Sequence, residues 1–316
     1  LAAPVLEQQT LWTAGQDGYH TYRIPALLVT AKGSVLAFCE GRKTGSGDHG
    51  DVDLIMKRST DGGRTWSPHR IVHEEGGEAK ITIGNPCPVV DSKTGSIWLP
   101  FTRDNKAVFI TSSTDDGQTW SAPRNLSATT MKPDWDWVAT GPGIGIQLTR
   151  GKHAGRLVIP SDHKRTLAGK QLEWNSHMMF SDDGGATWQI SAPISAGGNE
   201  CQVIERTDGS LLVNTRMQGG WEGWRGIATS TDGGAFTGST CRSFESRSCP
   251  TPMVYTGSFS ALRPEAVSWP MRRRPLRLRP FSASRSMGLS AAGLPASPLP
   301  PLSPRLLRSR RLLRSR

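Results

Sequence analysis

Charged side chains that could do chemistry gather in three stretches of this chain of 316 residues. The first is Arg23, which follows aromatic residues and stands directly before Ile-Pro, a context that restricts the backbone. The second is the glycine-rich segment 40–53, which holds Arg42 and four acids, Asp48 among them. A carboxyl group on such a loop can serve as a proton donor when desolvation raises its pKa. Arg23 could equally be a surface arginine that faces solvent. The segment 40–53 could equally be a solvated polar loop or a calcium-binding loop.

The third stretch pairs Glu200 with Arg216. Glu200 precedes the largely apolar run 201–204, and Arg216 ends the next apolar run, 211–216. Burying an unpaired carboxylate is costly, so we expect Glu200 to face a basic group, a hydroxyl or a ligand. If both strands line one inner rim, Arg216 is that group, either as part of a site or as a structural ion pair.

An octapeptide repeat, S-x-D-x-G-x-T-W, organises the chain around these stretches. Complete copies occupy 59–66, 113–120 and 181–188, and a fourth begins at Ser230 but departs from the pattern at Phe236. The intervals of 49 to 68 residues between the serines suit one four-stranded propeller blade plus a variable insertion. We interpret each copy as a hairpin turn in which Asp accepts backbone N–H groups and Trp packs inward. Calcium loops would need more oxygen ligands than the pattern offers.

Short apolar runs between Gly-, Asp- and Ser-rich turns predict strands at 34–39, 54–57, 96–101 and 157–160. We expect almost no helix in residues 1–236, because no apolar stripe of helical period occurs there. The G-x-G-x-G string at 141–145 is not a dinucleotide fingerprint, since Pro142 and β-type surroundings leave no βαβ unit. The tryptophans before it, Trp135 and Trp137, either wall a sugar or acetyl pocket or belong to the core.

Charge divides the chain in two. Of its 38 basic and 27 acidic side chains, 15 arginines and two glutamates lie in 237–316, which leaves 23 basic and 25 acidic groups in 1–236. The net charge of +11 therefore belongs to the tail, and we expect no nucleic acid as partner of the first part. We predict a partial propeller over 1–236 and an Arg/Pro-rich tail over 237–316 that is disordered or read out of frame. The alternative is a genuine basic tail that binds nucleic acid or anionic lipid.

Five cysteines without paired spacing support neither a metal knuckle nor a disulfide framework, and we expect mostly buried free thiols. We expect no metal and no transmembrane segment, since no apolar run is long enough to span a bilayer. The chain starts at Leu1 without Met, so a removed signal peptide and a fragment both fit, and the compartment stays open.

Tyr-Arg-Ile-Pro at 22–25, the repeated octapeptide, and Glu200 followed by Asn-Thr-Arg at 214–216 together resemble the exo-α-sialidase (neuraminidase) family. The resemblance covers about residues 8–236. Gly-Arg-Lys at 41–43 and Asn-Pro-Cys-Pro at 85–88 are closer to bacterial and animal members than to viral ones. It implies an all-β fold of the six-bladed β-propeller type, of which about four blades are recognisable here and the last blades are incomplete or lost.

The resemblance also implies roles. Arg23 and Arg216 resemble two of the three arginines that grip the carboxylate of sialic acid, a task that suits planar guanidinium groups. Asp48 resembles the acid/base at the glycosidic oxygen, and Arg42 an auxiliary pocket arginine. Glu200 resembles the base that activates a tyrosine nucleophile. A neutral phenol avoids the repulsion that a carboxylate nucleophile would meet from the substrate's own carboxylate.

The implied function is hydrolysis of terminal sialic acids from glycoproteins, glycolipids such as gangliosides, or oligosaccharides, with retention and without a cofactor. Secretion or periplasmic export is compatible with such an enzyme. The third arginine and the nucleophilic tyrosine of the family are not recognisable, and nothing around Tyr255 matches the nucleophile motif. The alternative is therefore an inactive propeller that binds sialic acid without hydrolysing it.

Overall fold

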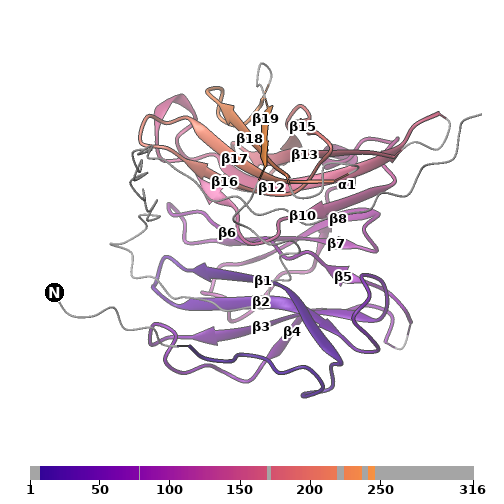
Figure 1. Cartoon of the computed structure of the whole chain (residues 1–316). Coiled ribbons are helices and arrows are strands. Elements are labelled where there is room, and N and C mark those ends of the chain that lie inside the picture. Colours follow the sequence, from indigo (N-terminus) through magenta and orange to yellow (C-terminus); the bar gives the residue numbers. More distant parts are fainter. Residues whose placement is uncertain (1–7, 78, 169–171, 219–223, 237–240, 246–316) are drawn as a thin grey trace, which may run out of the picture. The chain divides into compact units, whose positions relative to one another are not determined.

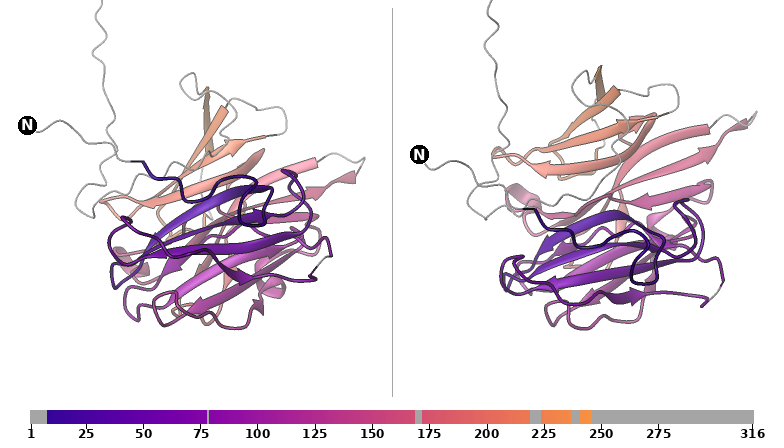
Figure 2. Two further views of the ribbon diagram at one scale, coloured as in Figure 1. Left: turned by 90° about the horizontal axis from the view of Figure 1, so that it is seen from below. Right: turned by 60° about the horizontal axis from the view of Figure 1, so that its bottom comes forward.

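The computed structural model describes residues 8–77, 79–168, 172–218, 224–236 and 241–245. Regular structure in these residues is almost entirely β, with one short helix, α1 (Ser127–Thr130), and one 3-10 turn, η1 (Gly151–His153). The strands form four antiparallel sheets that follow one another in chain order as blades of a propeller (Figure 1, Figure 2). The prediction of an all-β propeller with about four recognisable blades is confirmed.

The first and fourth blades are four-stranded meanders. The first consists of β1 (Thr21–Val29), β2 (Val35–Arg42), β3 (Val52–Ser59) and β4 (Arg70–His73). The fourth consists of β16 (Gly198–Glu205), β17 (Leu211–Met217), β18 (Trp224–Ser230) and β19 (Cys241–Glu245). The first strand of each is irregular, because the register shifts between Arg23 and Ala26 in β1 and between Gly198 and Cys201 in β16. Such irregularities re-aim the side chains beside them.

The second and third blades have a first strand that is broken in two. The second consists of β5 (Ile83–Gly84) and β6 (Val89–Val90), which both pair with β7 (Ile97–Arg103), followed by β8 (Ala107–Ser113) and β9 (Arg124–Asn125). The third consists of β10 (Trp137–Thr140) and β11 (Ile146–Gln147), which both pair with β12 (Leu157–Thr166), followed by β13 (Leu172–Ser181), β14 (Gln189–Ile190) and β15 (Ser195–Ala196).

The two breaks span 85–88 and 141–145, where prolines cannot donate to a strand ladder. The G-x-G-x-G string is thus the break between β10 and β11, with no helix after it, as predicted. All four blades are therefore irregular in their first strand, and these four irregularities carry residues of the candidate site.

The apolar core lies between the blades. Alternate residues of β12 show why: Leu157 and Ile159 pack into the cluster shared with the second blade, whereas Val158 packs into the cluster shared with the fourth. A strand that is buried on both faces reads as a continuous apolar run, which explains the predicted strand segments at 34–39, 54–57, 96–101 and 157–160. The segments 54–57 and 157–160 lie within observed strands, and 34–39 and 96–101 do so except for their first residues, Ser34 and Ser96.

The three complete octapeptides form the turns between β3 and β4, between β8 and β9, and between β13 and β14. In the first copy Ser59 Oγ donates to Asp61 Oδ1 at 2.7 Å, the Gly63 N–H donates to Ser59 Oγ at 2.9 Å, and the Thr65 N–H donates to Asp61 Oδ1 at 2.9 Å. The same bonds recur at 113–119 and 181–187. The scaffold interpretation of the repeat is thus supported, because the oxygens of these aspartates already accept protein N–H and O–H groups.

The fourth copy keeps this turn although its sequence departs from the pattern. The Gly234 N–H donates to Ser230 Oγ at 2.9 Å, and the Phe236 N–H donates to Asp232 Oδ1 at 3.0 Å. Ser, Asp and Gly make the bonds of the turn, so the loss of Thr-Trp leaves it intact. The backbone of β19 then completes the fourth blade beyond residue 236.

Arginines from the preceding blade hold the turns of the next one. Arg58 donates to the carboxylate of Asp116, which also accepts from Ser34 Oγ at 2.6 Å and from Thr30. Further inter-blade bonds run from Arg70 to Gly117 O and Gln118 O, from Arg124 to Gly185 O and Ala186 O, and from Arg156 to Gly233 O. The repeat therefore fixes the relation between neighbouring blades as well as the turn itself.

Cys39, Cys87 and Cys201 are buried free thiols, as predicted. The side chains of the other two cysteines, Tyr255, and the tail apart from the backbone of β19 lie outside the described residues. The expected tail over 237–316 stays a prediction.

Candidate active site

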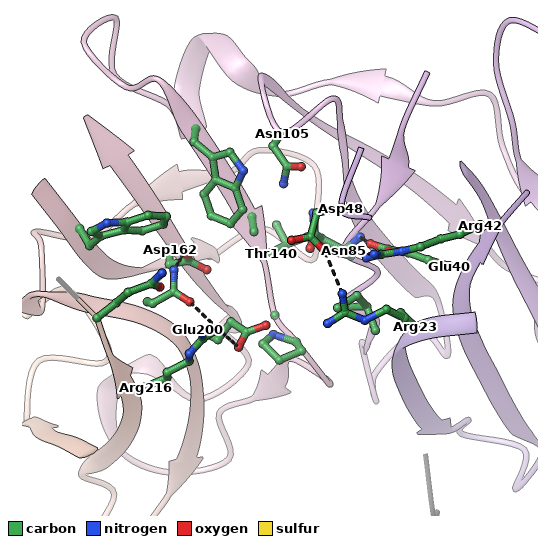
Figure 3. Close-up of a pocket in the computed structure, with 18 residues that line it drawn as sticks. Arg23, Glu40, Arg42, Asp48, Asn85, Asn105, Thr140, Asp162, Glu200 and Arg216 are labelled. Atoms are coloured by element: carbon green, nitrogen blue, oxygen red, sulfur yellow. Dashed lines mark hydrogen bonds and ion pairs between the residues drawn. The ribbon is translucent and has the colours of Figure 1, made fainter. Parts of the chain in front are cut away.

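A pocket of about 190 Å³ opens where the irregular first strands of the four blades meet (Figure 3). Each blade contributes lining residues from these strands, for example Arg23, Asn85, Pro142 and Glu200. All five residues predicted for the site line it: Arg23, Arg42, Asp48, Glu200 and Arg216. The structure thus gathers into one pocket residues that lie far apart in the sequence.

Arg23 and Asp48 form an ion pair at the edge of the pocket. Arg23 Nη1 donates to Asp48 Oδ1 at 2.9 Å, and the Asp48 side chain is 73% exposed. The desolvation expected for a proton donor is therefore not provided by the protein alone.

Arg42 is buried and its hydrogen bonds go to the protein. Its Nη1 donates to Ser46 O at 2.6 Å, to Gly47 O at 2.7 Å and to Asp48 Oδ1 at 3.0 Å. Its Nε and Nη2 donate to Glu40 Oε2 at 2.9 and 2.6 Å. The side chains of Arg42 and Glu40 are each 3% exposed, so Arg42 holds the loop that carries Asp48.

The base of this loop is closed by a second set of charges. Lys43 Nζ lies 2.9 Å from Asp51 Oδ1 and 3.1 Å from Asp53 Oδ1, and the Lys43 N–H donates to Asp51 O at 3.0 Å. Tyr19 Oη donates to Asp53 Oδ2 at 2.7 Å. The loop is therefore anchored at its base and from within, while its acid stays exposed.

Glu200 and Arg216 form the ion pair on the opposite side of the pocket (Figure 3). Arg216 Nη1 donates to Glu200 Oε2 at 3.1 Å, and both side chains are partly exposed. The expected basic partner of Glu200 is thus Arg216. Two partly exposed arginines thus lie on opposite sides of the pocket, Arg23 paired with Asp48 and Arg216 paired with Glu200.

Hydrogen bonds between blades hold several residues of the pocket lining in place. The Asn85 N–H donates to Glu40 Oε1 at 2.9 Å, and Thr140 Oγ1 donates to Asn85 O at 2.5 Å. Gln202 donates to Pro142 O, which joins the third blade to the fourth. Asn85 and Pro142 come from the breaks of the first strands, so the irregular backbone contributes directly to the pocket lining.

The two tryptophans of 135–137 have different positions. Trp135 is buried in the core and stacks on His163, with ring centroids 3.7 Å apart. Trp137 lines the pocket and meets Trp174 edge to face, with ring centroids 5.7 Å apart. Trp135 therefore belongs to the core, and Trp137 belongs to the wall of the pocket.

Residues 33–252 match the family model of the BNR repeat-like domain. The chain belongs to this family. The relatives that it resembles are sialidases, and the resemblance to the exo-α-sialidase family, bacterial and animal type, is confirmed. The chain is 34% identical to a sialidase of Micromonospora viridifaciens over 73% of its own length and 38% of that protein. It is 32% identical to sialidase-2 of Mus musculus over 67% of its length and 62% of that protein.

A solved structure of the same kind is the Hadza microbial sialidase Hz136. It superposes with a TM-score of 0.64 at 29% identity, covering 79% of this chain and 52% of that one. This sialidase-family chain thus spans between 38% and 62% of the length of the two curated relatives described.

Sequence reasoning missed two buried acids of this sialidase-family pocket, Glu40 and Asp162. Each is a charged residue at the end of an apolar strand segment, Glu40 after 35–39 and Asp162 after 157–160. That pattern is a usable signal, since a carboxylate buried in a strand needs a partner. The same argument that predicts a partner for Glu200 holds for Glu40 and Asp162.

The described residues contain no group of three or more His, Cys, Asp or Glu side chains placed to hold a metal ion. In the same part of the chain, no helix has the length and apolar character needed to cross a membrane. Its two described tyrosines bond elsewhere, Tyr19 to Asp53 and Tyr22 to Gln16 O.

Proposed function

We propose that this chain acts as an exo-α-sialidase that releases terminal sialic acids from glycoproteins, glycolipids such as gangliosides, or oligosaccharides. The observation that carries the proposal is the pocket in which Arg23 with Asp48 faces Arg216 with Glu200. Two guanidinium groups from opposite sides suit a substrate that carries its own carboxylate next to the reacting carbon.

In the proposed reaction Arg23 and Arg216 bind the carboxylate of sialic acid. Asp48 gives its proton to the glycosidic oxygen, which takes the electron pair of the breaking bond to the anomeric carbon. Glu200 accepts the proton of the nucleophile's hydroxyl group as its oxygen bonds to that carbon. In the second step Asp48 takes a proton from water as the water oxygen bonds to the anomeric carbon, the bond from that carbon to the nucleophile breaks, and the nucleophile's oxygen takes back its proton from Glu200. Two displacements at the same carbon give retention.

Arg42 has a supporting part in this scheme. Because its donors are bound to Glu40 and to the 46–48 loop, it sets where Asp48 stands. The nucleophile implied by the family resemblance is a tyrosine, and Tyr19 and Tyr22 do not line the pocket in the described part of the chain. No step of the proposal calls for a cofactor.

The second candidate, a propeller that binds sialic acid without turnover, is favoured by the engagement of both described tyrosines outside the pocket. The test is release of 4-methylumbelliferone from its α-linked sialoside, and of lactose from sialyllactose, by the purified chain and by Asp48→Ala. Hydrolysis of both by the wild type, with sialyllactose turnover lost in Asp48→Ala, supports the enzyme. Binding of sialyllactose by calorimetry without hydrolysis supports the second candidate, and neither binding nor hydrolysis refutes both.

A further inference from the structure

Asp162 is the most deeply buried acid of the pocket. It stands on β12 of the third blade and has no exposed surface, yet it contributes to the pocket lining (Figure 3). It faces the irregular part of β16 in the fourth blade, where Asn199 and Glu200 are adjacent. It therefore links the third blade to the fourth, which carries the Glu200–Arg216 pair.

Hydrogen bonds connect Asp162 to that pair through Asn199. Asn199 Nδ2 donates to Asp162 Oδ2 at 3.0 Å, and Asn199 Oδ1 accepts from Arg216 Nη1 at 3.5 Å. Arg216 Nη1 also donates to Glu200 Oε2 at 3.1 Å. The backbone carbonyl of Asn199 accepts from Ser176 Oγ at 2.6 Å, so the backbone is held as well. With its side chain fixed by Asp162, Asn199 presents its acceptor toward Arg216.

The surroundings of Asp162 favour its neutral form. Burial, and next the charge of Glu200, raise the pKa of Asp162 well above its usual range, whereas Arg216 opposes the shift. Its Oδ1 has no hydrogen-bond partner among the described residues. A buried carboxylate ion with one oxygen unpartnered is much costlier than the neutral acid. The neutral acid still offers Oδ2 to Asn199.

We propose that Asp162 is a positioning residue that acts as a neutral hydrogen-bond acceptor for Asn199 and thereby sets the direction of Arg216 and Glu200. This inference rests on the proposed function in one respect, the role of Arg216 in binding a carboxylate. The rival interpretation is an ionised Asp162 that serves as a second counter-ion of Arg216. The two interpretations predict different affinities for a carboxylate ligand when the charge of Asp162 is removed but its shape is kept.

The decisive variant is Asp162→Asn, which keeps the shape and an acceptor oxygen but cannot carry a charge. Calorimetry with 2-deoxy-2,3-didehydro-N-acetylneuraminic acid, an unsaturated carboxylate analogue of sialic acid, gives the affinity without needing turnover. We expect Asp162→Asn to bind within about threefold of wild type, and Asp162→Ala to bind about tenfold more weakly, the effect of one buried hydrogen bond. A loss of tenfold or more in Asp162→Asn overturns the proposal in favour of the ionised form.

A double-mutant cycle separates positioning from general destabilisation. Asp162→Ala and Asn199→Ala should each weaken binding, and the double variant should bind no more weakly than the worse single one, because both remove the same contact. Asp91→Asn is the matched control, a buried acid in the second blade bonded to Thr94 and Gln147. Additive losses at Asp162 and Asn199, or an equal loss in the control, would refute the positioning role.

The assay also distinguishes this inference from the proposed function. If the wild type binds the analogue but does not hydrolyse sialosides, the enzymatic proposal fails while the affinities still decide the part of Asp162. If the wild type hydrolyses sialosides and Asp162→Ala has the same kcat and the same affinity for the analogue as the wild type, the enzymatic proposal is supported and the positioning role is refuted. A wild type that does not bind the analogue overturns both.

Discussion

Arg23 donates from Nη1 to Asp48 Oδ1 at 2.9 Å, so the arginine proposed to bind the substrate's carboxylate is bound here to the acid proposed to protonate the leaving group. Arg216 and Glu200 repeat this relation across the pocket at 3.1 Å. A carboxylate ligand that takes both arginines must therefore compete with both acids.

We expect Asp48→Asn to bind the unsaturated analogue a few times more tightly than wild type, because removing an exposed counter-ion is worth at most about 1 kcal/mol. The same variant should lose about 10²–10⁴ in kcat on sialyllactose, the usual contribution of a general acid. Calorimetry and initial rates measure the two effects. Asp17→Asn, an exposed acid that does not line the pocket, is the control and should change neither. Weaker analogue binding by Asp48→Asn would contradict competition for Arg23.

Glu40→Gln tests whether the buried Glu40–Arg42 pair places Asp48. The variant leaves the Arg42 charge without its buried counter-ion and with only the exposed Asp48, and the loss of one partner of a buried pair costs about 3–5 kcal/mol. We expect a lower urea midpoint and a fall in kcat that is larger for sialyllactose than for the 4-methylumbelliferyl sialoside, since the better leaving group needs less help from the acid. Glu205→Gln, which removes an acceptor of Thr149 and Arg150 N–H groups, serves as control. Equal losses on both substrates would count against placement of Asp48 by this pair.

Asp116→Ala tests the inter-blade role of the second octapeptide. Asp116 accepts from Thr30 and Ser34 and pairs with Arg58, all in the first blade. We expect the free energy of unfolding to fall by about 3 kcal/mol, because the partners lose an acceptor that is charged and buried. Urea denaturation followed by tryptophan fluorescence measures this. Asp208→Ala, an exposed turn residue bonded to Ser210, should cost far less, and a similar cost for both would argue against the inter-blade role.

The buried pair of His163 and His177 should make stability depend on pH. Their Nδ1 atoms lie 3.0 Å apart, and burial lowers the pKa of His163 to about 3 and that of His177 well below its usual value. The unfolded chain takes up these protons near pH 6.5 but the folded chain does not, so stability is lost as the pH falls below that value. At pH 5 the loss is about 2 kcal/mol per histidine.

The measurement is the free energy of unfolding at pH 7.5 and at pH 5.0. Carboxylates also titrate in this window, so the comparison is with the double variant His163→Asn/His177→Asn, which should have a clearly smaller pH dependence. An equal pH dependence in both proteins would show that the pair does not contribute.

The fold could be predicted because its signals are local. The turn bonds of 59–66 join residues two to four positions apart, so the octapeptide alone specifies the turn. The fourth copy shows the limit of pattern matching. Ser230, Asp232 and Gly234 keep the turn although Phe236 departs from the consensus. The hydrogen bonds of the turn use the side chains of Ser230 and Asp232 and backbone N–H groups, so they do not need the Thr side chain that Phe236 replaces.

The sequence by itself determined the repeat, the β class and five residues of the candidate site: Arg23, Arg42, Asp48, Glu200 and Arg216. Only the tertiary structure decided their partners. Glu40 meets the Asn85 N–H and Asp162 meets Asn199 across blade boundaries, and Trp137 lines the pocket while Trp135, two residues earlier, is in the core. These relations depend on how one blade packs on the next. A residue type and its spacing along the chain state what a side chain can do, but the group that it meets is set by packing between segments far apart in sequence.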